Sequence, residues 1–339
     1  MGETTEHEQI EPAESPAAPP ADKDAPADTT RFDPWVGIAY HAIQVVFVVA
    51  AIIIAIAQNR DFVTILSGEG RVQFLFTLGL IGVPAIGMAI ALRLGQLDLS
   101  VGAMATFAMA VYAANDGGSP AQLTAIGTAI AIGAVTGAVS GALRIPAWLS
   151  TLALSFVLVA RFFDLVGPTP VPFGGDAPPA GTTPGLSVMF FVLGIAAAGV
   201  FLVLDVLRRP GQVKRIEELS LAPRILLPAA ALAITAGFAA YTGIMQAERV
   251  RLVAAPGLQT VLPAILAAVL IGGVGVFGGR VSLIGTMLGA LGLTIIEFGI
   301  VLAGESDPQV RMYISAIPLA IFLVLRGVAA VVRNERIPA

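Results

Sequence analysis

Runs of about 20 apolar residues recur along most of this chain, and each is long enough to cross a membrane as a helix. Only 12% of the 339 residues are charged, whereas soluble domains carry about 25%. A backbone inside lipid must satisfy its own hydrogen bonds, which favours helices. The sequence therefore predicts an all-α polytopic membrane protein with ten transmembrane helices, over residues 36–57, 72–92, 101–114, 121–143, 146–166, 186–206, 224–243, 258–277, 282–302 and 310–329.

The two ends of the chain are polar and flank a transmembrane domain over residues 34–331. Residues 1–33 are rich in Pro, Ala, Glu, Asp and Thr and lack the apolar surface that ordering requires, so we expect a disordered acidic tail. A second short tail covers residues 332–339. Cytoplasmic loops carry an excess of Lys and Arg, and this rule places both termini in the cytoplasm. The basic residues left on the other side are Arg60, Arg71, Arg249, Arg251 and Arg311.

One apolar run is shorter than the others. Residues 101–114 are about six short of a full span, and the gap before them holds Asp98 and Ser100. The sequence therefore predicts a broken helix near residues 95–100, with Gly102 in the first turn that follows. Asp98 or Ser100 either caps this helix start or forms a polar elbow beside a transport path, and both interpretations stay open.

A glycine cluster, "GGVGVFGGR", occupies residues 272–280 and contains the spacing G-x-G-x-x-G of nucleotide-binding turns. A long apolar run precedes it in place of a short strand, so we interpret it as a break in a membrane helix where backbones approach closely. The glycines of this predicted break are Gly272, Gly273, Gly278 and Gly279. In the next apolar run, Glu297 precedes Phe298. A lipid-facing carboxylate is costly, so Glu297 is expected to face the bundle interior, either lining a path or packed in the core.

Three stretches resemble a known family. "GQLDLSVGAM" (95–104) is similar to the G-x-x-DLSVG element of permease subunits of bacterial ABC importers for ribose, xylose and galactose. "AILAAVLIGGVGVFGGRVSLIGTMLGALGLTIIEFG" (264–299) resembles their glycine-rich stretch, and "RIPAWLSTLALSFVLVARFF" (144–163) their I-P-x-F-I-x-T-L-G segment. The likeness runs from about Phe74 to Leu325.

The resemblance implies a type II-like ABC importer permease in a bacterial inner membrane. Such a subunit moves a small polar solute, most often a monosaccharide, by alternating access; a nucleoside or another small polar solute is the alternative. ATP and Mg²⁺ would be bound by a separate cytoplasmic ABC ATPase, so no cofactor is expected in this chain. The other implied partners are an extracytoplasmic solute-binding protein, a second copy or a related permease, and membrane lipid. No nucleic-acid partner is expected.

The inner loop over residues 207–224 is the expected contact with the ATPase, although it departs from the family pattern except for its basic start and the "ELS" near its end. Its candidate coupling residues are Gln212, Ile216, Glu217, Glu218, Leu219 and Ser220. The alternative is that its basic residues only set the membrane orientation.

Two other function classes follow from the residues themselves. A buried carboxylate at Asp98 or Glu297 is compatible with an ion-coupled secondary transporter that works alone. A membrane-embedded enzyme is disfavoured, because the sequence offers no Ser/His/Asp cluster and only two histidines, and it predicts no catalytic or metal-binding residues.

Overall fold

The computed structural model describes residues 34–63, 70–172, 174, 188, 192, 196, 220–253, 261–273, 282–304, 310, 313 and 316–324. Both predicted tails and the predicted span 186–206, apart from three isolated helical positions, lie outside these residues. The helices are α1 (Pro34–Gln58), α3 (Gly70–Arg93), α4 (Val101–Ala114), α5 (Gly118–Leu143), α6 (Ala147–Val166), α8 (Leu221–Val250), α9 (Leu262–Ile271) and α10 (Leu283–Leu302).

Five helices are long and apolar enough to cross a membrane, namely α3, α5, α6, α8 and α10. Shorter apolar helices cover Ala42–Gln58, Val101–Ala114 and Leu262–Ile271. The described part of the chain is mostly helical, which agrees with an all-α membrane protein and indicates several membrane crossings. The count of ten spans stays a prediction, as does the interpretation of α4 as part of a broken span.

Helix ends occur where the local chemistry requires them. Ser282 accepts a hydrogen bond of 3.0 Å from the Gly285 N–H at the start of α10, which satisfies one of the unpaired donors of that end. Helix α9 ends at Ile271 and not near residue 277 as predicted, because Gly273 follows with φ 79°, a left-handed conformation that ends a helix. Helix α8 is longer than predicted and continues through Pro228.

A two-residue antiparallel ribbon joins the segment after α6 to the end of α8. Strand β1 (Val171–Pro172) pairs with β2 (Leu252–Val253), with Val171 opposite Val253. Arg251, between α8 and β2, forms an ion pair of 2.7 Å with Glu248. The Tyr112 hydroxyl at the end of α4 donates to the other Glu248 oxygen, so this carboxylate links α4 to the end of α8.

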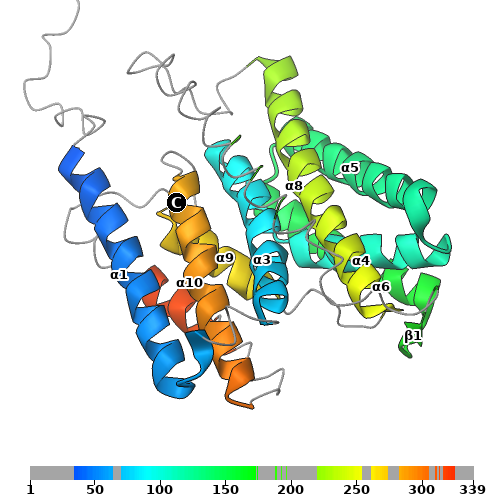
Figure 1. Cartoon of the computed structure of the whole chain (residues 1–339). Helices are drawn as coiled ribbons and strands as arrows, with labels where there is room; N and C mark the ends of the chain where they lie inside the picture. Colours follow the sequence, from blue (N-terminus) through cyan, green and yellow to red (C-terminus); the bar gives the residue numbers. More distant parts are fainter. Residues whose placement is uncertain are drawn as a thin grey trace, which may run out of the picture. The chain divides into compact units, whose positions relative to one another are not determined.

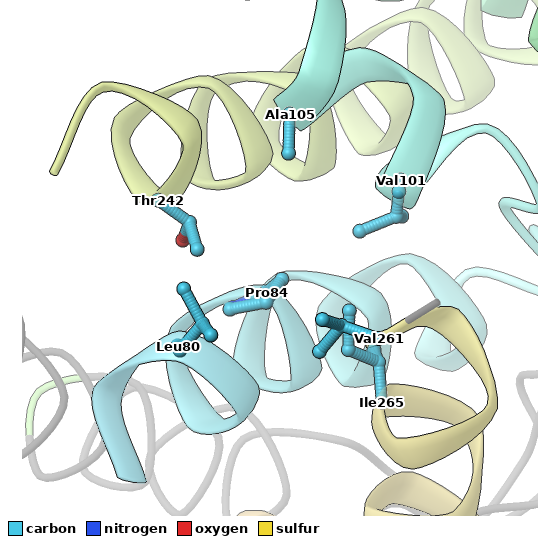
Figure 2. A pocket seen from close by; sticks show the side chains of 8 residues that line it. Leu80, Pro84, Val101, Ala105, Thr242, Val261 and Ile265 are labelled. Atoms are coloured by element: carbon cyan, nitrogen blue, oxygen red, sulfur yellow. The ribbon is translucent and has the colours of Figure 1, made fainter. Parts of the chain in front are cut away.

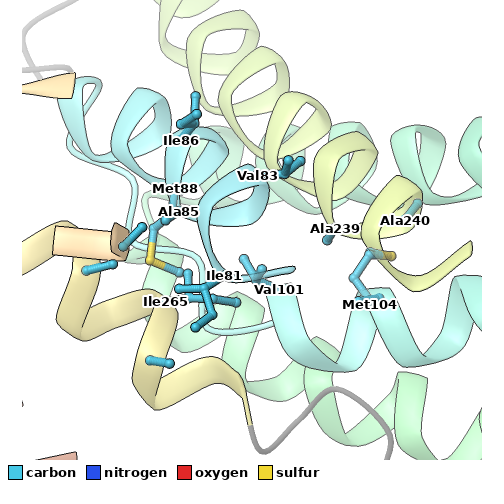
Figure 3. Close-up of a cluster of buried hydrophobic side chains, with 14 of the residues drawn as sticks. Ile81, Val83, Ala85, Ile86, Met88, Val101, Met104, Ala239, Ala240 and Ile265 are labelled. Carbon is cyan, nitrogen blue, oxygen red and sulfur yellow. The ribbon is translucent and has the colours of Figure 1, made fainter. Parts of the chain in front are cut away.

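The apolar core is centred on α3, which lies between α8 and α10 (Figure 1). Its side chains interdigitate with those of α4, α8 and α9 (Figure 3). Much of the outer surface of α5 and α6 is apolar and exposed, for example Leu123 and Phe156. Exposed apolar helix faces are what contact with lipid tails requires.

Candidate functional site at the connection between α3 and α4

Residues 94–100 form a non-helical connection between α3 and α4. The chain leaves α3 through a turn in which the Gly95 N–H donates to the Leu92 carbonyl at 2.9 Å. Gly95 has φ 72°, a conformation in which glycine meets no Cβ penalty. The turn directs the following residues back into the bundle, where Asp98 and Ser100 are each only 2% exposed.

Asp98 is the centre of a buried polar network. Its Oδ1 accepts hydrogen bonds from the Ser100 N–H at 2.8 Å and from the Ser100 hydroxyl at 2.6 Å. Its Oδ2 accepts a hydrogen bond of 2.7 Å from the Thr235 hydroxyl of α8. Both carboxyl oxygens therefore have partners, which is the condition under which a polar group is tolerated in an interior.

The start of α4 has no side-chain cap. Ser100 is its N-cap residue, but no side-chain cap bond is made, because its hydroxyl is turned toward Asp98. Asp98 accepts the N–H of Ser100, two residues on, and not an N–H inside the first turn of α4. Asp98 thus shapes the approach to the helix and ties it to α8, while Gly102 lies buried in the first turn.

A third helix holds the same connection. The Leu99 N–H donates a hydrogen bond of 3.0 Å to the hydroxyl of Thr151 on α6. Thr151 is 1% exposed, and its own hydroxyl donates to the Ala147 carbonyl at 2.8 Å. The connection is therefore bonded to α6 on one side and to α8 on the other, and it fixes where α4 begins.

The second predicted break lies at the end of α9. Gly272 and Gly273 form a turn there, and Gly278 and Gly279 lie outside the described residues. A Cβ on Gly272 would lie 2.5 Å from the Thr286 backbone nitrogen, so glycine allows α9 and α10 to approach here. Gln44 of α1, 1% exposed, donates to the Ile271 carbonyl at 3.3 Å and satisfies an acceptor that the helix end leaves open.

Glu297 and Phe298 lie on α10, and both are distant along the chain from the two predicted helix breaks. Glu297 is partly buried. Phe298 is 4% exposed and makes edge contacts with Phe62 and Phe74, with ring centroids 6.1 and 5.6 Å apart. These contacts indicate that Phe298 packs in the core.

Of the candidate coupling residues, Ser220 alone lies among the described residues. It is exposed directly before α8, and its carbonyl accepts the Arg224 N–H at 3.2 Å. Gln212, Ile216, Glu217, Glu218 and Leu219 lie outside the described residues.

Two cavities border the central helices. A void of about 10 Å³ lies where α3, α4, α8 and α9 meet, with Pro84 and Thr242 on its wall (Figure 2). An open apolar groove of about 380 Å³ lies between α5 and α8, beside Ile130 and Phe238. Neither of these two cavities is lined by Asp98 or Glu297.

The sequence did not indicate the polar partners at the two breaks, namely Thr235 and Thr151 at the connection before α4 and Gln44 at the end of α9. Each is a single polar residue in an apolar run, and a hydroxyl in a helix commonly bonds to its own backbone, so its position alone does not single it out. One partner could have been predicted: a lone glutamine in an apolar run, such as Gln44, needs a polar partner inside lipid.

Comparisons with protein-family models, with curated proteins and with solved structures find no match to this chain.

Proposed function

We propose that this chain is the membrane-spanning permease subunit of an ATP-driven ABC importer for a small polar solute, and we expect this solute to be a monosaccharide. The observation that carries the proposal is the buried, hydrogen-bonded Asp98 in the connection between α3 and α4. The D-L-S-V-G stretch that resembles the importer permeases lies at this connection. A motif that builds a polar elbow among membrane-length helices is consistent with a role in transport.

The chemistry of the solute sets what the helices must supply. Each hydroxyl of a sugar that enters hydrocarbon without a partner costs several kcal/mol, so the path must offer water or polar groups. Asp98, Ser100 and Thr235 gather such groups at the connection between α3 and α4. The subunit itself performs no covalent chemistry in this proposal, and the ATPase and the solute-binding protein are separate chains.

A second candidate is an ion-coupled transporter that works alone. It is favoured by the same carboxyl group, because the Asp98 oxygens accept hydrogen bonds from the N–H and hydroxyl of Ser100 and from the hydroxyl of Thr235, just before α4 begins. The two functions differ in their energy source, and this difference can be measured directly.

The test compares energy sources in proteoliposomes. The full-length chain is purified with its associated proteins from the membranes of cells that naturally make it, and uptake of labelled ribose, xylose and galactose is measured. We expect an ABC ATPase in the preparation and uptake that needs internal ATP. Uptake by the chain alone, abolished by a proton ionophore and indifferent to ATP, would replace this proposal with the ion-coupled transporter.

A further inference from the structure

The described helices form two groups that share α3. Helices α4 and α5 pack on each other and on both α6 and α8, and α10 contacts α1 and α9. Helix α3 packs on α8 from the first group and on α9 and α10 from the second, and Figure 1 shows it between them. We call these the α8 group and the α10 group.

Side-chain hydrogen bonds near the start and near the end of α4 hold it to α8. Thr235 bonds to Asp98 just before α4 begins, and Glu248 bonds to Tyr112 near its end. Between these two bonds, the Ala105 carbonyl occupies the space that a side chain on Gly243 would need. A shift of α4 along α8 would break both hydrogen bonds, so the two helices move together.

Helices α5 and α8 are joined by close backbone contacts. Gly133, Gly137 and Gly141 each leave the space of a Cβ to a carbonyl oxygen of α8, those of Leu232, Pro228 and Arg224. Glycines at a helix crossing allow this approach in membranes. Since backbone atoms interlock at three successive turns, sliding between α5 and α8 would meet repeated clashes.

The α10 group is held in the same two ways. Gln44 bonds α1 to the end of α9, and Asn59 donates to the Leu302 carbonyl at the end of α10. Gly289 of α10 faces the Ala268 carbonyl of α9. Side-chain hydrogen bonds and close backbone contacts therefore also hold this group together.

The buried surface of α3 is apolar, unlike the contacts within the two groups, which include side-chain hydrogen bonds. From Phe74 to Leu92 its side chains are apolar except for Thr77, whose hydroxyl bonds to the Gln73 carbonyl of its own helix. The side-chain hydrogen bond from α3 to α8 joins Gln73 to Arg249 at the Phe74 end of this stretch, where the Arg249 guanidinium also lies over the Phe76 ring, 4.8 Å from its centroid. Within the stretch, the ring of Phe238 fills the notch left by Gly87. Apolar surfaces of this kind slide without breaking hydrogen bonds.

Helix α3 also carries its own bending point. Pro84 has no N–H for the Leu80 carbonyl, and prolines inside helices are the usual origin of kinks. The void of about 10 Å³ lies beside Leu80 and Pro84, where the two groups meet (Figure 2).

We propose that the α8 group and the α10 group move as two rigid bodies against each other along the apolar surface of α3, with Pro84 as the bending point. The motion is a property of this single chain. It goes beyond the proposed import function and does not depend on which solute is carried.

The test measures distances between spin labels in lipid nanodiscs, and the absence of cysteines from the chain allows two labels to be placed freely. The cross-group pair is Ile53→Cys with Leu123→Cys. The within-group controls are Leu123→Cys with Leu226→Cys, and Ile53→Cys with Ile284→Cys, all at exposed positions. We expect narrow distributions for both controls and a second population, displaced by ~5 Å or one helical turn, for the cross-group pair.

Two proline variants complete the test. Pro84→Ala should collapse the cross-group distribution to one population, because it restores a donor for the Leu80 carbonyl. Pro228→Ala, the matched change inside α8, should leave that distribution as it is. A cross-group distribution as narrow as the controls in the unmodified chain overturns the proposal, and so does an equal response to the two proline changes. Neither outcome depends on ATP or solute, so the import function is tested separately.

Discussion

The hydroxyl of Thr235 donates a hydrogen bond of 2.7 Å to Oδ2 of Asp98, which lies 137 residues earlier in the chain. This bond fastens the connection before α4 to the middle of α8. The hydroxyl also lies 3.0 Å from the Leu232 carbonyl, so a second acceptor is within its reach. The elbow at Asp98 is therefore a tertiary feature, built from two segments that are far apart in sequence.

Replacing Thr235 by Val should destabilise the protein. The change leaves one oxygen of a buried carboxyl group without its donor, which costs about 1–3 kcal/mol. Thr235→Ser retains the hydroxyl and should stay close to the unmodified protein. The midpoint of thermal unfolding in detergent measures both effects. Equal midpoints for Thr235→Val and Thr235→Ser would mean that the bond contributes nothing to stability.

Asp98→Asn should be tolerated better than Asp98→Leu. The Asn oxygen can still accept the Ser100 N–H, and its amide can donate to Thr235, whose hydroxyl then turns to the Leu232 carbonyl. Leu offers no acceptor, so the Ser100 groups become buried and unpaired. The yield of folded protein after detergent extraction tests this order. Full yield and full transport with Asp98→Leu would remove Asp98 from the proposed site.

Gly137→Ala should be destabilising, because a Cβ there would meet the Pro228 carbonyl of α8. Overpacking of this kind costs about 1–3 kcal/mol or more. Gly127 provides the matched control on the same helix, since nothing lies within 4 Å of its added Cβ. Gly127→Ala should be neutral or stabilising by up to about 1 kcal/mol. If thermal unfolding shows the same loss for both variants, the crossing of α5 and α8 is not as close as described.

Ser119 and Ser220 should be reached from opposite sides of the membrane. Ser119 begins α5 near Tyr112 and the end of α8, whereas Ser220 precedes the start of α8, a helix of 30 residues and about 45 Å. Arg144 and Arg224 lie at the Ser220 end, and from the distribution of basic residues we predict that this end faces the cytoplasm. A membrane-impermeant maleimide should label Ser119→Cys in right-side-out vesicles and Ser220→Cys in inverted ones. Labelling of both from one side would contradict this orientation.

The helical, apolar character of the chain and the position of most described helices could be predicted from the sequence alone. Apolar runs of sufficient length are a local property, because each residue contributes its own transfer free energy, so α3, α5, α6 and α10 begin and end near the limits of their runs. The non-helical connection before α4 could also be predicted, because Gly, Asp and Ser, here Gly95, Asp98 and Ser100, favour turns and helix ends.

Which polar residues meet could not be predicted from the sequence, because it depends on how the helices pack. Helix interfaces in lipid form by close packing and interhelical hydrogen bonds, and neither depends on sequence distance. The sequence contains no sign that Thr235 and Thr151 would converge on one connection, or that Gln44 would reach the end of α9. The hydrogen bonds that hold each of the two helix groups together therefore form only when the helices pack.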